Sequence, residues 1–252
     1  MSAASSPRLR VLKLGGSLLD DASRRADAIE GIMSSWNVGE QIVLVHGGGK
    51  HIDAALAKLG IPKRSHAGLR ITDDATLHVV VSVLAGTVNK MIVSELAAQG
   101  VRCAGISGAD AGTLVAAVHP PIDGVELGHV GRVTESSPTL IKALLNYGIL
   151  PVVSSVAIGP HGNLLNVNAD AAAAAIATTL GASSLQFITD VAGLLDGNGV
   201  VVPSLTASDA QRLLASEIVS GGMKPKLQAA LGALASGVPK IRIGGGTEVV
   251  AA

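Results

Sequence analysis

Residues 11–17 read VLKLGGS, an apolar strand pattern that contains one lysine and ends in two glycines. Residues 42–49 repeat the pattern as IVLVHGGG, and here the strand ends in three glycines. Glycine lets the backbone approach a ligand closely and aim its N–H groups at anionic oxygens, while a neighbouring lysine adds positive charge. Two strand ends of this kind indicate a phosphate site and, with it, a phosphoryl-transfer enzyme.

Strand and helix patterns alternate along the rest of the chain, which is typical of βαβ units. We therefore expect an α/β fold, namely a three-layer αβα sandwich around a central, mainly parallel sheet. A hairpin is expected within residues 62–72, a long helix over about residues 73–99, and an alanine-rich helix, capped by Asn168, over residues 169–180. Ligands bind at the carboxyl ends of the strands in such a sheet, and the glycine turns fall at these ends.

The composition excludes several classes of protein. The chain has 252 residues, no net charge and 1% aromatic residues, and a nucleic-acid-binding surface needs basic patches or aromatic side chains. Cys103 lies in an apolar stretch and is interpreted as a buried strand thiol rather than a nucleophile. Residues 1–10 lack the apolar core of a signal peptide, and Gly, Pro or charge interrupts the apolar runs before membrane-spanning length. We therefore expect a cytoplasmic enzyme.

Three charged residues are candidates for the chemistry, and two of them, Lys13 and Asp170, also have an ordinary structural explanation. Lys13 lies within an apolar strand, where its charge needs an anion or a path to solvent. Asp170 lies in a first helical turn, where a carboxylate also interacts favourably with the helix dipole. Lys226 follows another glycine pair, in GGMKPK at residues 221–226. His46 enters a glycine turn, where a histidine is more often structural than a general base, and the other histidines are too scattered to predict a metal site.

The arrangement resembles the amino acid kinase family, and within it the acetylglutamate branch, over nearly the full length. The shared segments are KLGG (13–16), VHGGG (45–49), GLRIT (68–72), LAGTVNK (84–90), ELGHVG (126–131), LPVVSS (150–155), NVNAD (166–170), DVAGLL (190–195) and GGMKPK (221–226). The resemblance implies a single domain over residues 1–252. A lobe of about residues 1–150 would bind the acyl amino acid and form the dimer, and a lobe of about residues 151–252 would bind ATP.

The same resemblance assigns roles to particular residues. Lys13 and Lys226 would neutralise the transferring phosphoryl group, and Asp170 would hold both lysines in place as the third catalytic residue. The substrate-binding residues would be Gly48, Gly49, Arg70 and Asn166, with the last two on the α-carboxylate. The ATP-binding residues would be Gly15, Gly16, Asp190, Val191, Ala192, Gly193, Leu194, Leu195, Ile218, Val219 and Ser220. Gly16 and Gly48 would offer N–H groups to the γ-phosphoryl oxygens.

The implied reaction is the ATP-dependent phosphorylation of N-acetyl-L-glutamate to N-acetyl-L-glutamyl 5-phosphate, in arginine biosynthesis. A carboxylate is already a nucleophile at neutral pH, so positioning and charge neutralisation carry the catalysis and no general base is needed. Mg²⁺ is expected to bridge the β- and γ-phosphates, ligated largely by phosphate and water, so no protein metal site is predicted.

Two departures from the family pattern affect these expectations. Residues 240–250 pass directly from KIRI into GGGTEVV, where relatives usually insert a loop and a helix. This shortening falls in the nucleotide-binding half, so it concerns the outer cover of the ATP site rather than the catalytic residues. The N-terminus has no room for the helix that arginine-inhibited hexameric relatives carry before the first strand. The resemblance therefore implies a homodimer that free arginine does not inhibit.

Three alternatives remain open at this stage. One is a sister kinase for acetyl- or carrier-linked α-aminoadipate in lysine biosynthesis, because one extra methylene is a weak discriminator. Another is a non-catalytic nucleotide-binding regulator on the same fold, against which the retention of Lys13, Asp170 and Lys226 argues. The last is a dinucleotide oxidoreductase, but residues 14–17 lack the G-x-G-x-x-G spacing. The segment GGGKH at residues 47–51 likewise fails as a P-loop.

Overall fold

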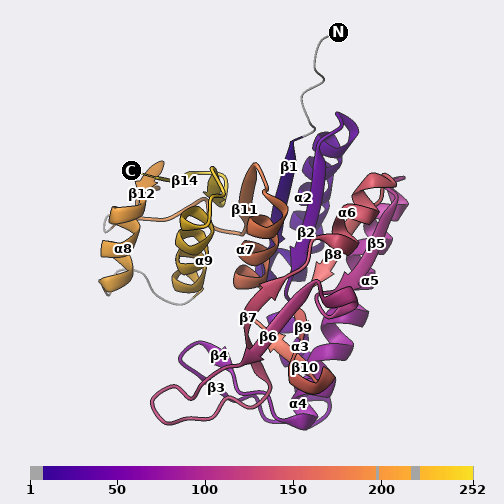
Figure 1. Cartoon of the computed structure of the whole chain (residues 1–252), viewed down its shortest axis with the longest axis vertical. Helices are drawn as coiled ribbons and strands as arrows, with labels where there is room; N and C mark the ends of the chain where they lie inside the picture. The colour runs from indigo at the N-terminus through magenta and orange to yellow at the C-terminus, as the bar shows by residue number, and fades with distance from the viewer. Residues whose placement is uncertain (1–7, 197–198, 217–221, 252) are drawn as a thin grey trace.

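A central, mainly parallel sheet forms the middle layer of the molecule (Figure 1). The computed structural model describes residues 8–196, 199–216 and 222–251. In spatial order the strands are β12 (Ser204–Thr206), β14 (Thr247–Val250), β13 (Ile241–Ile243), β11 (Ser184–Ile188), β1 (Leu9–Leu14), β2 (Gln41–His46), β8 (Leu150–Ser154) and β5 (Cys103–Ser107). Of these neighbours, β13 and β14 run antiparallel to each other and the remaining pairs are parallel.

Helices pack on both sides of the sheet, and each side has its own hydrophobic core. One core includes residues of α1 (Gly16–Asp20), α2 (Ala22–Asn37), α3 (Gly49–Lys58) and a continuous run formed by α4 (Asp74–Val81), the π-helical turn η1 (Ser82–Val88) and α5 (Asn89–Ala98). The other core includes residues of α6 (Thr139–Asn146), α7 (Ala169–Leu180), α8 (Ala207–Ala215) and α9 (Met223–Ala235). The expected three-layer αβα arrangement is confirmed.

Alternation of side chains along β1 explains how a lysine enters this fold. Val11 belongs to the core that contains α7, whereas Leu12 and Leu14 belong to the opposite core. Because successive residues of a strand face opposite sides of the sheet, Lys13 faces the same side as Val11. The Lys13 side chain therefore lies on the side of the sheet that is covered by α7 and α9.

A small barrel and a hairpin lie together at one end of the molecule (Figure 1). The barrel consists of β6 (Leu114–Val118), β7 (Val130–Ser136), β9 (Val156–Ile158) and β10 (Leu164–Val167). The hairpin, β3 (Ser65–His66) and β4 (Leu69–Arg70), confirms the expectation for residues 62–72. Its turn residues, Ala67 (φ 48°) and Gly68 (φ 80°), both adopt the left-handed conformation that two-residue hairpin turns favour.

The helical run Asp74–Ala98 is strongly apolar, although Gly86 and Lys90 interrupt it as the sequence predicts. It is 25 residues long and, by length and composition, apolar enough to cross a membrane. Its apolar residues nevertheless pack in the core of the fold, as Val80, Val88 and Ile92 do at 0% exposure. The run is therefore a core helix in this structure.

The π-helical turn within this run also went unpredicted, and it lies against a glycine turn. A Cβ atom on Gly48 would lie 3.0 Å from Leu84 Cδ2 and 3.1 Å from Val88 Cγ2, both on the π-turn. The absence of a side chain at Gly48 therefore lets this turn pack closely against Leu84 and Val88, whereas a larger residue would collide with them. π-Helical turns inside an α-helix are frequent at functional sites.

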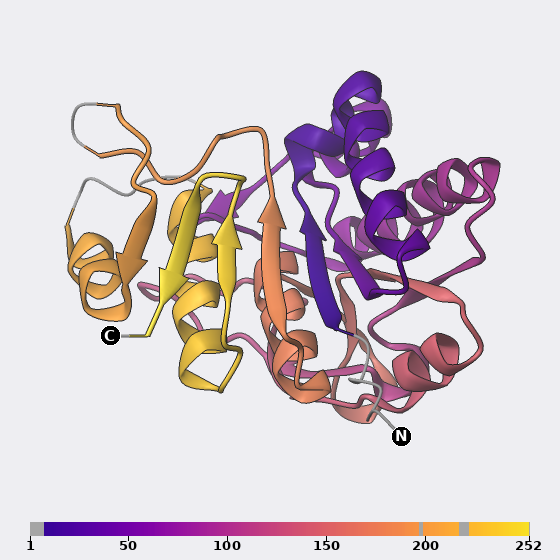
Figure 2. The same ribbon diagram turned by 90° about the horizontal axis from the view of Figure 1, so that it is seen from above.

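The C-terminal strands of the sheet have helices packed on one face only within the described part of the chain. Figure 2 shows β14, β13 and β11 side by side, with α9 and α7 behind them. On the opposite face, Arg242 Nε lies 3.3 Å from Glu248 Oε2, and Gln186 Nε2 donates to the Gly244 carbonyl at 3.2 Å. Polar side chains suit a solvent-facing sheet surface. This is the place where the family resemblance predicts a loop and a helix between Ile243 and Gly244 that the sequence does not contain.

The tight turn between β13 and β14 gives a stability prediction. Gly244 has φ +61°, and a Cβ there would lie 2.5 Å from the Val191 carbonyl oxygen and 2.6 Å from that of Ala192. We expect Gly244→Ala to lower the free energy of unfolding by about 2–3 kcal/mol, because strain and overlap add. Gly245 has open space around it, so Gly245→Ala is the matched control and should change stability by less than about 0.5 kcal/mol. Urea denaturation of both variants measures the difference, and equal midpoints would contradict the prediction.

The proposed division into lobes near residue 150 remains a prediction. The strand that begins there, β8, lies between β2 and β5 in the sheet. Residues 150–167 therefore extend the half of the molecule that contains the barrel and the hairpin. The two halves share one continuous sheet, joined where β1 pairs with β11.

Candidate active site

The register of the sheet brings the glycine turns to one edge. Leu14, the last residue of β1, pairs with His46 at the end of β2 and with Ile188 at the end of β11. The segments that follow these three strands therefore start side by side. Adjacent parallel strands end at the same edge of a sheet, so the clustering follows directly from the βαβ pattern.

Two lysines from opposite halves of the sequence meet one buried carboxylate at this edge. Lys13 Nζ lies 2.8 Å from Asp170 Oδ1, and Lys226 Nζ lies 3.5 Å from Asp170 Oδ2. Lys13 and Asp170 are 6% and 4% exposed, respectively. Asp170 lies in the first turn of α7, and Lys226 lies in the first turn of α9 and also donates to the Gly222 carbonyl at 3.2 Å. The ion pairs expected from the sequence are present.

The electrostatics of this cluster leave an excess of positive charge. Burial lowers the pKa of Lys13 below its usual value, an effect that Asp170 opposes and Lys226 reinforces. One carboxylate faces two ammonium groups, so an additional anion would be stabilised beside them. The local fold supports the carboxylate, because the Asn168 side chain accepts hydrogen bonds from the N–H groups of Asp170 (2.8 Å) and Ala171 (3.0 Å).

The glycines at the strand ends do not all offer their N–H groups. Gly15 donates its N–H to the Ile188 carbonyl at 2.8 Å, which ties β1 to β11. Gly16 and Gly49 are the first residues of α1 and α3, so their N–H groups have no carbonyl partner within their own helices. A Cβ on either residue would meet nothing within 4 Å. Gly16 and Gly49, rather than Gly15, are therefore placed to bind an anion through the backbone.

Arg70 reaches the same region from the hairpin. Its Nη2 donates to the Gly49 carbonyl at 3.2 Å and to Asp53 Oδ1, while its Nη1 is buried and has no hydrogen-bond partner among the described residues. A buried guanidinium nitrogen without a partner is costly unless a ligand accepts its hydrogen bond. Asn166, on β10, donates from Nδ2 to Thr72 Oγ1 at 3.1 Å. Both residues support an anion site at this position.

A pocket of about 330 Å³ joins these groups. It is lined by Lys13, Gly16, Gly47, Gly48, Gly49, Arg70, Asn166 and Asp170, together with Ser155, Asn168 and apolar residues that include Ile52 and Leu84. Its volume lies within the range of small-molecule sites, and polar groups from β1, the hairpin, the barrel and the first turn of α7 converge on it. Lys226 reaches Asp170 without lining this pocket.

The segment at residues 190–195 lies beside the pocket's glycine turn. A hydrogen bond from Ser17 lowers the pKa of Asp190, and Thr189 Oγ1 also donates to its carboxylate at 3.0 Å. Val191 and Leu195 expose 39% and 46% of their surface, whereas Leu194 is buried. A Cβ on Gly193 would lie 2.4 Å from Thr247 Oγ1, so this glycine is fixed by packing.

The shortened tail supports this segment through its backbone. Gly246 donates its N–H to the Ala192 carbonyl at 2.7 Å, and Thr247 Oγ1 accepts from the Leu194 N–H at 2.8 Å. The tail therefore fixes the backbone of this segment. Ile218, Val219 and Ser220 lie outside the described residues.

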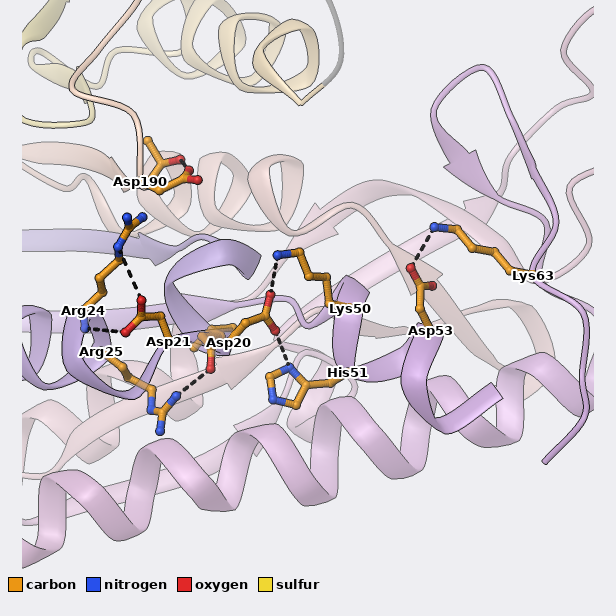
Figure 3. A network of polar contacts seen from close by, with 11 residues as sticks. Asp20, Asp21, Arg24, Arg25, Lys50, His51, Asp53, Lys63 and Asp190 are labelled. Carbon is orange, nitrogen blue, oxygen red and sulfur yellow. Dashed lines mark hydrogen bonds and ion pairs between the residues drawn. The ribbon is translucent and has the colours of Figure 1, made fainter. Parts of the chain in front are cut away.

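A charged network that the sequence did not predict holds the two glycine-led helices together (Figure 3). Asp20, at the end of α1, lies 3.2 Å from Lys50 Nζ and 3.1 Å from His51 Nδ1, and both partners lie in the first turn of α3. The network fixes α1, which begins at Gly16, against α3, which begins at Gly49. Such contacts depend on tertiary packing, so no sequence pattern predicts them.

The surroundings of His46 and Cys103 indicate structural rather than catalytic roles. The His46 ring is fully buried, contacts the Gly47 carbonyl at 3.0 Å through Nδ1 and lies 3.1 Å from Asn89 Nδ2 through Nε2. Burial lowers the pKa of His46 to about 4, so the ring is neutral at pH 7. Cys103, on β5, is only partly buried rather than buried as expected, and this partial burial still raises the pKa of its thiol, which makes the thiolate scarce. Neither group is poised for proton transfer or nucleophilic attack.

A second cavity, of about 410 Å³, lies at the opposite end of the strands, and three of its basic side chains are in ion pairs. Arg10 Nη1 lies 2.9 Å from Glu40, and both Arg242 and Lys240 pair with Glu248 on β14. No glycine-rich turn lies among its lining residues. The pocket at the carboxyl ends is therefore the better candidate for chemistry.

The comparison with known proteins agrees with this geometry. A family model described as the amino acid kinase family matches residues 8–245. The chain belongs to the amino acid kinase family. Acetylglutamate kinase from Geobacillus kaustophilus is 42% identical over 233 residues, which cover 92% of this chain and 88% of that protein. Acetylglutamate kinase from Rubrobacter xylanophilus is 43% identical over 239 residues, covering 95% and 90%.

Solved structures share this fold over nearly the full chain. A Streptococcus mutans protein superposes with a TM-score of 0.86 at 29% identity, covering 96% of this chain and 98% of that one. Carbamate kinase from Giardia lamblia bound to AMP-PNP superposes with a TM-score of 0.73 at 18% identity, covering 99% and 100%. The family and the fold expected from the sequence are both confirmed.

Proposed function

We propose that this protein transfers the γ-phosphoryl group of ATP to the side-chain carboxylate of N-acetyl-L-glutamate, forming N-acetyl-L-glutamyl 5-phosphate in arginine biosynthesis. The observation that carries the proposal is the buried Asp170 carboxylate between Lys13 and Lys226, at the edge of a pocket that also contains Arg70. One end of the pocket suits a phosphoryl group and the other a carboxylate. The relatives that match at 42–43% identity are acetylglutamate kinases.

The chemistry requires an anionic nucleophile to approach an anionic phosphoryl group. Lys13 and Lys226 would neutralise the charge that gathers on the transferring oxygens, and Asp170 would keep both ammonium groups aimed at them. The N–H groups of Gly16 and Gly49 would orient the reacting groups. A substrate carboxylate attacks without a general base, which is consistent with the neutral, enclosed His46.

Mg²⁺ fits this site as an ion that arrives with the nucleotide. Among the described residues there is no group of three or more His, Cys, Asp or Glu that could hold a metal ion. Asp170, the carboxylate in the pocket, is already paired with two lysines. When bound, Mg²⁺ would neutralise the β- and γ-phosphates, with phosphate and water as its main ligands.

ATP is proposed to lie across the segment at residues 190–195. The exposed side chains of Val191 and Leu195 offer apolar surface, and Asp190 offers a carboxylate beside α1. Gly15 would contribute by holding β1 against β11, because its N–H is engaged there. Gly193 and Leu194 would act through the position of the backbone, since packing fixes both.

Replacing Arg70 with lysine should raise the KM for N-acetylglutamate about tenfold to a hundredfold and change kcat and the KM for ATP by less than threefold. Lysine keeps the charge but lacks the planar fork that binds a carboxylate through two nitrogens. Initial rates at varied acetylglutamate, with saturating ATP, measure the effect. An unchanged KM would remove Arg70 from the substrate site.

We further propose that the enzyme is a cytoplasmic homodimer. The family resemblance supports this proposal. Sedimentation of the purified full chain would measure its mass in solution.

ADP release in the presence of Mg·ATP tests the proposed function against its alternatives. The acceptors are N-acetyl-L-glutamate, N-acetyl-α-aminoadipate, glutamate and none. Turnover with acetylglutamate at least tenfold above the others supports the proposal. Preference for the longer acid would assign the enzyme to lysine biosynthesis with the same mechanism. ATP binding without turnover on any acceptor would support the non-catalytic regulator.

A further inference from the structure

The two terminal nitrogens of the Arg70 guanidinium have different surroundings. Its Nη2 is engaged by Asp53 Oδ1 and by the Gly49 carbonyl, and its Nη1 is buried without a partner among the described residues. The Arg70 side chain is 12% exposed and lines the pocket. One nitrogen is therefore anchored by the protein, and the other has no acceptor among the described residues, as expected for a group whose acceptor is a ligand.

Asp53 is well placed to set this orientation. It lies four residues after Gly49 on α3, so helical spacing puts it on the same side of the helix as the Gly49 carbonyl. Its other oxygen, Oδ2, accepts a hydrogen bond from Lys63 Nζ at 2.7 Å (Figure 3). Burial alone would raise the pKa of Asp53, but the hydrogen bonds from Lys63 and Arg70 outweigh it and keep the pKa below its ordinary value. The group is therefore a carboxylate at neutral pH.

The hairpin that carries Arg70 is short, and backbone hydrogen bonds hold its base in place. Its strands are two residues long each. Its base is fixed by the backbone, since the Thr72 N–H donates to the Leu127 carbonyl at 3.0 Å and the His129 N–H donates to the Thr72 carbonyl at 2.7 Å. The fold of the hairpin base does not depend on Asp53, whereas the aim of the guanidinium does.

We propose that Asp53 is a positioning residue that holds Arg70 so that Nη1 faces the α-carboxylate of the acyl amino acid. This inference rests on the proposed function. It assigns part of the enzyme's preference for an α-carboxylate to a residue that does not touch the substrate. A flexible arginine has to lose side-chain freedom on binding, and an arginine held beforehand does not.

The test compares two acceptors that differ only in the α-carboxylate, N-acetyl-L-glutamate and 4-acetamidobutyrate. We expect Asp53→Ala to lower kcat/KM for acetylglutamate about tenfold, mainly through KM, and Asp53→Asn to have a smaller effect. With 4-acetamidobutyrate, kcat/KM should change less than twofold, because there is no α-carboxylate to receive Nη1. Lys63→Gln removes the other partner of Asp53 and leaves Arg70 bound, so it should change neither value by more than twofold.

The outcomes separate this inference from a purely structural role. An equal loss on both acceptors would show that Asp53 only maintains the fold, and would overturn the inference. A KM for acetylglutamate at or below that of the wild type would overturn it as well, because repulsion between Asp53 and the substrate would then dominate. An effect of Lys63→Gln as large as that of Asp53→Ala would overturn it too, by assigning the role to hairpin tethering in general. Wild-type enzyme that does not turn over acetylglutamate would instead overturn the proposed function.

Discussion

Lys13→Ala is expected to lower kcat by about three orders of magnitude while changing KM for either substrate less than about threefold. The ammonium group is buried, lies 2.8 Å from Asp170 and lines the pocket at the edge where phosphoryl transfer is proposed. Its positive charge would matter most when negative charge gathers on the transferring oxygens, so its loss lowers kcat. Removal of a single charged group from such a centre commonly costs about 10²–10⁵-fold in rate.

Stability must be followed in the same variant, because Lys13 belongs to a buried ion pair. Breaking such a pair typically costs about 3–5 kcal/mol. Lys226 still faces Asp170 in this variant, so a smaller loss is expected here. Lys13→Met is the matched variant, because methionine fills more of the space that lysine leaves than alanine does. We expect it to have the same low kcat as Lys13→Ala and a higher unfolding midpoint. A kcat within tenfold of wild type in either folded variant would contradict the proposed role of Lys13.

Asp170→Asn is expected to lower kcat about a hundredfold or more and to give activity a new dependence on pH. Burial already lowers the pKa of Lys13, and Asp170 is the group that opposes this shift most strongly. Without the carboxylate, the pKa of Lys13 falls further. A lysine neutralises phosphoryl charge only when it is protonated, so kcat of the variant should fall as pH rises, starting at a lower pH than in the wild type.

Stability of the same variant should change with pH in the opposite direction. A lysine with a lowered pKa binds fewer protons in the folded state than in the unfolded state, so stability rises as pH rises between the two pKa values. We therefore expect Asp170→Asn to become more stable and less active over the same pH range. Parallel pH profiles of kcat and of the urea midpoint measure both. Activity and stability that rise or fall together would contradict the proposed coupling of Lys13 to Asp170.

Much of the site could be predicted because its parts follow from local patterns. The strand–glycine junctions after residues 14 and 46 lie side by side because β1 and β2 are parallel neighbours, as the βαβ pattern requires. Lys13 was identifiable because a lysine is unusual inside an apolar strand. Asp170 could be placed because Asn168 caps α7 one residue before the helix begins.

The remaining features depend on packing between distant segments. Gly15 occurs in a phosphate-like motif, yet its N–H is used by the Ile188 carbonyl, which only the pairing of β1 with β11 determines. Asp53 and Arg70, which are 17 residues apart in the sequence, pair between a helix and a hairpin. The π-helical turn, Ser82–Val88, leaves no distinct periodicity in so apolar a stretch. These features decide which glycine N–H groups are free and how the arginine is aimed.

Hydroxylamine trapping of the acyl phosphate tests the central claim most directly. An acyl phosphate reacts with hydroxylamine to form a hydroxamate, which mass spectrometry identifies, so the assay reports the bond that the enzyme forms. With Mg·ATP and N-acetyl-L-glutamate, we expect N-acetylglutamyl 5-hydroxamate in amounts equal to the ADP released, and none with Lys13→Ala over the same time. ADP released together with inorganic phosphate, with no hydroxamate, would contradict phosphoryl transfer to the side-chain carboxylate.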